Sequence, residues 1–178
     1  MPPLHGVILV GHGMIPADFP KRELAEFRRL SAAEPSSARI EEIKARLRRW
    51  PRTPDNDPYR AGLEAIGEAL RRALPDRLVL TAYNEFCSPT PQEAAAEAVR
   101  RGASEISLMT TMFTRGGIHS ETELPEIARE LGRRHPQARF RYVWPYDLGA
   151  VAAFLSGELF RTQTGSGLHN SHPGDREL

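Results

Sequence analysis

Four short apolar segments recur along this chain, and a helical pattern separates each from the next. The apolar segments are Leu4–Val10, Leu78–Tyr83, Glu105–Met112 and Ala138–Trp144. The helical patterns are Tyr59–Leu74, Pro91–Gly102, Thr122–Arg134 and, after the last segment, Asp147–Phe160. Strands joined through helices pair in parallel, because a parallel connection must cross from one end of the sheet to the other. The alternation therefore predicts an α/β fold, with a four-stranded, mainly parallel sheet and helices on both faces.

A long segment, Pro16–Pro58, interrupts this alternation after the first strand. It contains two further helical patterns, Lys21–Leu30 and Arg39–Trp50, so we expect a helical insertion that lies outside the sheet. Such an insertion acts either as a lid over a ligand site or as a packing element, and both interpretations remain open. The chain as a whole fits one domain over residues 1–161. The Gly-, Ser- and His-rich tail over residues 162–178 is predicted to be disordered.

Charge and cysteine content narrow the functional classes. Lys and Arg total 24 and Asp and Glu total 23, a balance that gives no case for a nucleic-acid or membrane-surface partner. Cys87 is the only cysteine, so an intrachain disulfide is impossible and a reducing compartment fits best. The amino-terminal segment lacks the basic region and the long apolar run of a signal peptide. We therefore expect a cytoplasmic protein.

Side chains with metal-binding chemistry follow three of the four predicted strands. His12 follows the first strand between two glycines, Glu85 follows the second, and His119 lies in a glycine-rich segment after the third. Ligands of open parallel sheets bind beyond the carboxyl ends of the strands, so these three side chains are expected to converge there. Two imidazoles and a carboxylate suit a first-row divalent cation. The sequence thus predicts a metal site made by His12, Glu85 and His119.

Several residues near this predicted site also have simpler interpretations. Glu121 and Glu123 are candidate proton relays, although the helix dipole also favours acidic residues at a helix N-terminus. Cys87 adjoins the site but is expected to be a small buried residue. In the tail, His169 and His172 could collect metal, but an ordinary disordered tail is the simpler expectation.

Three segments around the candidate ligands resemble the signatures of a known family. They are Val7–Gly13 (VILVGHG), Tyr83–Pro89 (YNEFCSP) and Gly116–Pro125 (GGIHSETELP). These segments resemble the CbiX/SirB sirohydrochlorin chelatases, and Trp144–Leu155 resembles that family's closing strand and following helix. The chain differs from the family at Met14, where serine is usual, and at Asn84, where an apolar residue is usual. The resemblance implies a class II chelatase half unit.

The resemblance also implies an activity and roles for individual residues. The family inserts a divalent metal ion (Co²⁺, Fe²⁺ or Ni²⁺) into sirohydrochlorin or a related tetrapyrrole, for cobalamin, sirohaem or related cofactor biosynthesis. By similarity, His12 and His119 would bind the incoming metal, and Glu85 would act with them as ligand or base. Small members of the family hold the tetrapyrrole between two units, so a homodimer is expected. No nucleotide is expected, because the chain contains no phosphate-binding GxxxxGK[ST] loop.

Substrate contacts are expected in the segment after the third strand. Sirohydrochlorin carries many carboxylates, and Arg115 is the best-placed cation to pair with one of them, with a solvated loop arginine as the alternative. Gly116 and Gly117 beside it would let a bulky flat ligand approach the backbone. These three residues are the predicted substrate-binding group.

Two other functions fit parts of the pattern. A histidine phosphatase needs an arginine immediately before its nucleophilic histidine, and Gly11 stands before His12, which argues against that class. A non-catalytic carrier of metal or tetrapyrrole on the same fold would need the same site residues. The sequence does not separate such a carrier from a chelatase.

Overall fold

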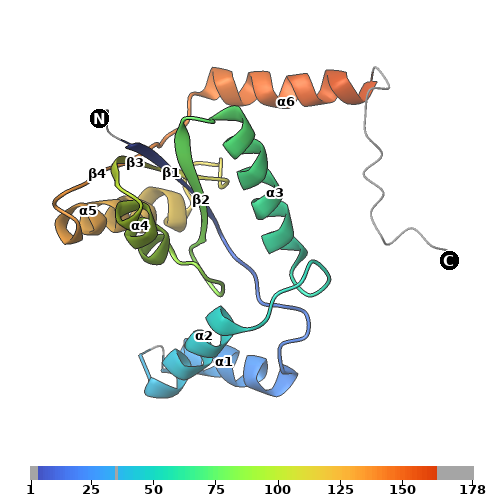
Figure 1. Ribbon diagram of the computed structural model, residues 1–178. Helices are drawn as coiled ribbons and strands as arrows, with labels where there is room; N and C mark the ends of the chain where they lie inside the picture. Colours follow the sequence, from blue (N-terminus) through green and yellow to red (C-terminus); the bar gives the residue numbers. More distant parts are fainter. Residues whose placement is uncertain (1–3, 35, 164–178) are drawn as a thin grey trace. The chain divides into compact units, whose positions relative to one another are not determined.

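The computed structural model describes residues 4–34 and 36–163. Its strands are β1 (Leu4–Gly11), β2 (Arg77–Tyr83), β3 (Ala103–Thr110) and β4 (Arg139–Tyr142). Its helices are α1 (Lys21–Ala33), α2 (Ala38–Arg49), α3 (Pro58–Ala73), α4 (Pro91–Arg100), the π-helical turn η1 (His119–Glu123), α5 (Leu124–Arg134) and α6 (Leu148–Gln163). The chain forms two compact units, Met1–Trp144 and Pro145–Leu178, and Figure 1 shows the sheet with its helices in the first and α6 in the second.

The four strands form one sheet in the order β2-β1-β3-β4, and every neighbouring pair is parallel. This confirms the predicted fold class. The central strand β1 pairs on both sides, so that Val10 lies opposite Ala82 of β2 and Thr110 of β3. A strand with neighbours on both sides and helices on both faces is buried on both faces, as β1 is from Gly6 to Gly11, which explains its apolar run Val7–Val10.

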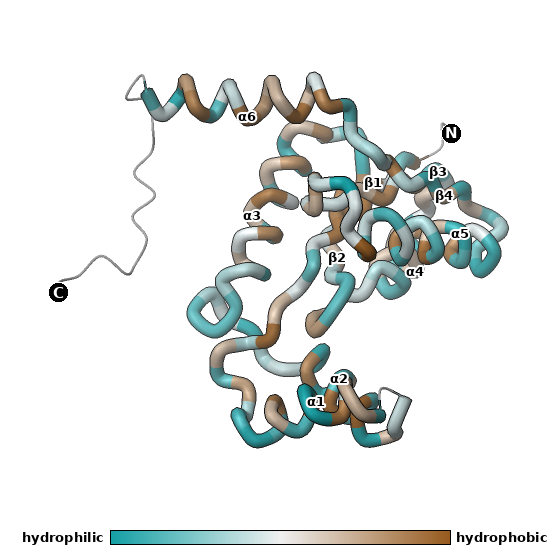
Figure 2. Tube along the Cα trace, turned by 180° about the vertical axis from the view of Figure 1, so that it is seen from behind, coloured by the Kyte–Doolittle hydropathy of each residue, from teal (hydrophilic) through white to brown (hydrophobic). Residues whose placement is uncertain are grey.

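The two faces of the sheet are covered by different helices. Ile8 and Val10 of β1 contribute to one hydrophobic core, which α4 and α5 complete with their alanine and leucine residues. Leu9 points to the other face and packs with Leu63 of α3 and the buried Tyr83. Figure 2 shows hydrophobic residues concentrated in the strands and alternating with hydrophilic ones along the covering helices. Helices on both faces were predicted, and the structure confirms them.

Side-chain caps fix where two of these helices begin. The Asp57 carboxylate accepts a hydrogen bond from the Arg60 N–H at the start of α3, and Pro58 occupies the first turn, where its missing N–H is not needed. At the start of α4, Thr90 and Glu93 each accept from the other's backbone N–H, which forms a capping box.

The segment between β1 and α3 forms the predicted helical insertion. Figure 1 shows α1 and α2 packed together, away from the strands. They enclose a small hydrophobic core of their own, formed by Phe19, Leu30, Ile40, Ile43 and Leu47. Ion pairs from Arg39 to Glu26 and from Arg46 to Glu23 join the two helices across their exposed sides. A separate core lets this insertion fold without contributing to the sheet, which leaves it available to line a site.

A buried arginine ties the insertion to the sheet domain. The Arg52 side chain is 4% exposed and forms an ion pair with the 1%-exposed side chain of Asp57. Its guanidinium also donates to the backbone carbonyls of Met14, Leu47 and Phe86. Arg52 therefore joins the loop after β1, the end of α2 and the loop after β2 in a single hydrogen-bonded network.

One helix begins earlier than the sequence predicts. Thr122–Arg134 was expected as one α-helix, but helical backbone starts at His119 with the π-helical turn η1, and α5 follows from Leu124. The Leu124 N–H bonds to the carbonyl of His119, five residues back, which is the defining bond of a π-turn. Such single turns are rare, and apolar periodicity does not reveal them.

The second unit contains α6, which begins one residue later than predicted. Asp147 caps it, as expected, by accepting a hydrogen bond from the Ala150 N–H. Of the predicted disordered tail, 162–178, Thr162 and Gln163 belong to α6, and the other residues, with His169 and His172, lie outside the described residues. The extent of the domain, 1–161, stays a prediction. Within residues 4–34 and 36–163, no helix is both long enough and apolar enough to cross a membrane.

Candidate metal centre

The structure brings together the three residues that the sequence predicts as ligands. One donor atom from each of His12, Glu85 and His119 lies within 4.8 Å of the others. The side chains of His12, Glu85 and His119 are 40%, 38% and 19% exposed, so the group is open on one side. Two ligands of one first-row ion stand at most about 4 Å apart, since each bond is ~2.0–2.2 Å long. A small side-chain rotation therefore suffices to place all three on one ion.

Continued pairing beyond the strands sets His12 beside Glu85. The Asn84 N–H donates to the carbonyl of Gly11 and the Glu85 N–H donates to that of His12, at 2.9 and 2.8 Å. These bonds extend the β1–β2 pairing by two residues past the ends of the strands. As a result, His12 Nε2 lies 3.7 Å from Glu85 Oε2, on the same edge of the sheet.

Hydrogen bonds at Nδ1 assign the same tautomer to both histidines. His12 Nδ1 lies 2.7 Å from the carbonyl oxygen of Gly13, and His119 Nδ1 lies 2.7 Å from Glu123 Oε2. A carbonyl and a carboxylate oxygen can only accept, so each Nδ1 is assigned the proton and donates it. At His119 the nearby Asn84 amide nitrogen then donates to Glu123 and not to the ring. The lone pair on each Nε2 is then available, which is the arrangement found in metal-binding histidines with an acceptor behind them.

Glu123 and Asn84 form a second layer behind His119. The Asn84 amide nitrogen lies 2.9 Å from His119 Nδ1 and donates to Glu123 Oε2 at 2.8 Å. Burial raises the pKa of the Glu123 carboxyl, but hydrogen bonds from His119 and Asn84 outweigh it, and the net shift of this pKa is downward. The ionised carboxylate is therefore held where it orients the imidazole. The sequence did not assign this role, although the four-residue spacing from His119 to Glu123 is a signal for it.

The turn η1 brings the paired side chains to the same face. Side chains four positions apart are neighbours in an α-turn and remain neighbours in this π-turn. In η1 these side chains are His119 and Glu123, and Ser120 between them is buried under the turn. Glu123 thus acts on His119 rather than standing free as a proton relay.

The glycines beside His12 make room for the protein's own chain. A Cβ on Gly11 would lie 2.7 Å from Leu63 Cδ2, and a Cβ on Gly13 would lie 2.0 Å from the carbonyl oxygen of Glu85. Gly13 also has a φ of 94°, which residues with a side chain rarely adopt. The structure therefore gives these two glycines a packing role, against α3 and against the Glu85 loop.

Substitution of Gly13 by alanine tests this packing. We expect Gly13→Ala to lower the free energy of unfolding by about 2–3 kcal/mol, because it combines backbone strain with a clash against backbone that cannot rotate away. The Co²⁺ affinity should fall as well, since the Glu85 loop is pushed outward while all three donors remain. Urea unfolding and Co²⁺ titration measure the two effects.

Gly132→Ala is the matched control for that substitution. Gly132 lies within α5, and a Cβ there would meet nothing within 4 Å. This variant should be neutral or more stable by up to about 1 kcal/mol, because alanine favours the helix. Equal effects of the two substitutions would show that Gly13 is not a packing constraint.

The predicted substrate-binding residues lie in the exposed loop between β3 and η1. The Arg115 side chain is 67% exposed and pairs with Glu121 at 3.1 Å, and the Gly116 N–H donates to the same carboxylate. The hydrogen bond from Arg115 is the main reason that the pKa of Glu121 is lowered. Gly116 has a φ of 87°, so its glycine serves the turn. Substrate binding by Arg115, Gly116 and Gly117 stays a prediction.

Cys87 is close to Glu85 in the sequence, but its buried thiol is poorly suited to metal binding or catalysis. Its side chain is part of the core beside Tyr83, and burial raises the pKa of its thiol. A thiol with a raised pKa is a weak nucleophile and a weak ligand. The structure therefore agrees with the expectation of a small buried residue.

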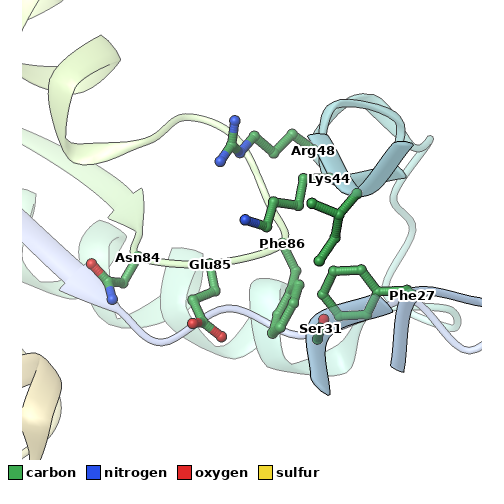
Figure 3. Close-up of a pocket in the computed structure, with 8 residues that line it drawn as sticks. Phe27, Ser31, Lys44, Arg48, Asn84, Glu85 and Phe86 are labelled. Carbon is green, nitrogen blue, oxygen red and sulfur yellow. The ribbon is translucent and has the colours of Figure 1, made fainter. Parts of the chain in front are cut away.

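Two cavities flank the candidate metal centre, and the insertion lines both of them. One, of about 350 Å³, lies between Glu85 and the insertion helices, and Figure 3 shows it with Lys44 and Arg48 reaching in from α2. The other, of about 620 Å³, contains His12 and Gly13. Phe86 borders both, and its ring centroid is 6.3 Å from that of His12. The insertion is thus part of the surroundings of the site and not only a packing element.

Comparisons with known proteins find two similar solved structures, each at 17% sequence identity. A cobalamin (vitamin B12) biosynthesis CbiX protein from Marinobacter aquaeolei VT8 matches with a TM-score of 0.51, over 89% of this chain and 98% of the other. The sirohydrochlorin chelatase SirB from Bacillus subtilis subspecies spizizenii, in complex with cobalt, matches with a TM-score of 0.43, over 80% and 43%. No curated protein matches.

The family assignment comes from the sequence match. The model of the CbiX family matches residues 53–152, which include Glu85, His119 and the π-turn. The match starts after α2, so the helical insertion lies outside it. More than half of the chain is covered, and the fold agrees with that of the Marinobacter aquaeolei CbiX protein. The chain belongs to the CbiX family.

Proposed function

We propose that this protein inserts a divalent metal ion into sirohydrochlorin or a closely related tetrapyrrole, acting as a chelatase of cobalamin, sirohaem or related cofactor biosynthesis. The observation that carries the proposal is the convergence of His12, Glu85 and His119, with both Nε2 atoms free to bind. Membership of the CbiX family and the signature segments around these three residues support it. We further propose that the protein acts in the cytoplasm, as a homodimer.

The metal ion is a substrate in this reaction, so it must be bound and then released. Two neutral imidazoles and one carboxylate leave coordination positions for water, unlike a closed four-ligand structural site. His12 and Glu85 are more than one-third exposed, which gives the face of a macrocycle access to the ion. The proposed metal is Co²⁺, Fe²⁺ or Ni²⁺, because this ligand set accepts all three and supply often decides among them.

Insertion also requires that two pyrrole N–H protons leave the macrocycle. We assign the first proton to Glu85, whose carboxylate stands beside the metal position and is 3.7 Å from His12 Nε2. As the ion moves onto the pyrrole nitrogens, the Nε2 lone pairs of His12 and His119 are freed, and one of them accepts the second proton. Two protons leave as one divalent ion enters, so charge is balanced.

Glu85→Gln separates proton acceptance from substrate binding. The amide keeps the shape of the side chain but is not a base, so turnover should fall by ~10²-fold, at the lower end of the usual range for general bases. Affinity for sirohydrochlorin should change by less than about 3-fold, since most of its contacts are elsewhere. Turnover is measured as the initial rate of the change in visible absorbance. Affinity is measured by fluorescence titration with metal-free sirohydrochlorin.

Glu121→Gln and Glu123→Gln complete that comparison. Glu121→Gln should leave turnover near the wild-type value, because this carboxylate is engaged with Arg115. Glu123→Gln should act on metal affinity, by about 10-fold, because it removes the partner of His119. A normal rate in Glu85→Gln together with a slow rate in Glu121→Gln would move the base to Glu121.

A non-catalytic carrier would bind the same ligands, so the rate of insertion decides between the two functions. Co²⁺, Fe²⁺ and Ni²⁺ are each mixed with sirohydrochlorin, with and without protein, and the absorbance change is followed. The proposal requires multiple turnovers above the spontaneous rate with at least one metal. Stoichiometric binding without excess rate would identify a carrier.

A further inference from the structure

The helical insertion places two cations on the wall of the cavity that contains Glu85. Lys44 and Arg48 are one helical turn apart on α2, and both line the 350 Å³ cavity together with Asn84 and Glu85. Figure 3 shows both side chains extending from α2 towards the segment that carries Asn84 and Glu85. Arg48 also lines a second cavity, which contains Asn84 and Glu123. Its guanidinium is therefore near the residues that surround His119.

Arg48 differs from two other arginines of α2. Arg39 pairs with Glu26 and Glu42, and Arg46 pairs with Glu23, so both serve the packing of the insertion. Within residues 4–34 and 36–163, Arg48 forms no ion pair or hydrogen bond, and its charge acts only through space on Glu41, whose pKa it helps to lower. Its charge is available to a ligand.

The pair formed by Lys44 is easily exchanged. Lys44 contacts Glu41 at 2.7 Å, but the Glu41 side chain is 58% exposed. An exposed ion pair of this type contributes little stability and is screened by salt. A ligand carboxylate in the cavity can therefore replace Glu41 as the partner of Lys44.

Two aromatic side chains line the same cavity, together with Ser31 and Ile40. Phe27 of α1 and Phe86 of the β2–α4 loop face each other with their ring centroids 6.0 Å apart, in a T-shaped arrangement. The cavity thus combines an apolar surface, two cations and the candidate base Glu85. A flat aromatic ring system with ionised carboxylates on its rim has the complementary chemistry, since the ring contacts the phenyl groups and the carboxylates reach the cations.

We propose that Lys44 and Arg48 of the insertion bind rim carboxylates of the tetrapyrrole and so hold it over His12, Glu85 and His119. This inference rests on the proposed function and adds a substrate-binding wall to it. The wall lies outside residues 53–152, the part of the chain that the family model matches. Lys44 and Arg48 would thus act in addition to Arg115, the substrate-binding cation predicted from the sequence.

Arg48→Gln and Arg49→Gln form a matched pair for testing this. The two residues are adjacent on α2, and Arg49 lines none of the described cavities around the site. The probe is uroporphyrin, a flat tetrapyrrole with carboxylates on every peripheral side chain, titrated by fluorescence without metal or turnover. Arg48→Gln should weaken its binding by ~3–10-fold, and Lys44→Gln/Arg48→Gln by more, whereas Arg49→Gln should stay within about 2-fold. Thermal melting checks that the variants are folded.

Two further measurements separate carboxylate recognition from other effects. Mesoporphyrin, which has far fewer carboxylates, should be much less sensitive to Arg48→Gln than uroporphyrin. In sirohydrochlorin turnover, Arg48→Gln should raise KM and leave both kcat and Co²⁺ affinity near the wild-type values.

The outcomes distinguish this inference from the proposed function. Equal uroporphyrin affinity in Arg48→Gln and Arg49→Gln, or no binding of uroporphyrin and sirohydrochlorin to the wild type, would overturn the inference. An absence of metal insertion by the wild type, with the difference between Arg48→Gln and Arg49→Gln intact, would overturn the chelatase activity but not the carboxylate-binding wall.

Discussion

Replacing His12 or His119 with alanine is expected to weaken Co²⁺ binding by at least about 100-fold and to reduce metal insertion to the spontaneous rate. Changes behind a metal-binding histidine already reduce affinity ~10–100-fold, and removal of the ligand itself should exceed that. Because each variant removes one of three donors, binding and turnover should fall together. Co²⁺ titration and initial rates of insertion into sirohydrochlorin give the two values.

His5→Ala is the control for both variants. His5 lies on the same strand, β1, but at its amino end, so it is remote from the edge of the sheet that carries His12. Its replacement should leave Co²⁺ affinity and turnover unchanged. Wild-type rates in both His12→Ala and His119→Ala would show that these histidines are structural and that the proposed mechanism is wrong.

Loss of the Arg52–Asp57 ion pair is expected to have the largest effect on stability. Arg52→Met leaves the Asp57 carboxylate charged and buried without its partner, which destabilises a protein by about 3–5 kcal/mol. It also releases the carbonyl of Phe86, so the Glu85 loop should be less well ordered and Co²⁺ affinity should fall. Urea unfolding measures the first effect and Co²⁺ titration the second.

A second substitution shows whether the unpaired charge is the cause. Asp57→Asn removes that charge but keeps an oxygen that can cap α3. Arg52→Met/Asp57→Asn should therefore be more stable than Arg52→Met alone. If the double variant is less stable, the backbone hydrogen bonds of Arg52, and not its pair with Asp57, dominate its contribution.

The sheet and its candidate ligands could be predicted because both depend on simple periodicity. The apolar runs at Leu4–Val10 and Leu78–Tyr83 are β1 and β2 within one residue at each end. Parallel strands present their carboxyl ends at one edge, so whatever follows each strand must lie there. For that reason His12 and Glu85, 73 positions apart in the sequence, could be predicted to lie side by side.

Features that depend on tertiary packing could not be predicted from the sequence. Whether Gly13 yields space to a ligand or to the Glu85 carbonyl depends on the path of the β2–α4 loop. Lys44 and Arg48 face Glu85 because Arg52 anchors the end of α2 to the loop after β2. Helical periodicity places residues on a face of a helix, but it does not state what that face meets.

Glu123 is an intermediate case. Its spacing from His119 was visible in the sequence, and its acidic character had an adequate explanation in the helix dipole. The structure decides between the two explanations, because it places His119 Nδ1 2.7 Å from Glu123 Oε2. The spacing in the sequence fits both explanations and does not choose between them.

The most direct measurement is the position of the ion itself, from anomalous scattering in crystals of the protein soaked with Co²⁺. The account predicts one ion at the carboxyl edge of the sheet, ~2.0–2.2 Å from His12 Nε2, His119 Nε2 and a Glu85 oxygen. Loss of that peak in His119→Ala crystals, soaked identically, would confirm the assignment of the ligands. The proposed metal centre would be contradicted if the crystals bound Co²⁺ at another site while His12, Glu85 and His119 contacted no ion.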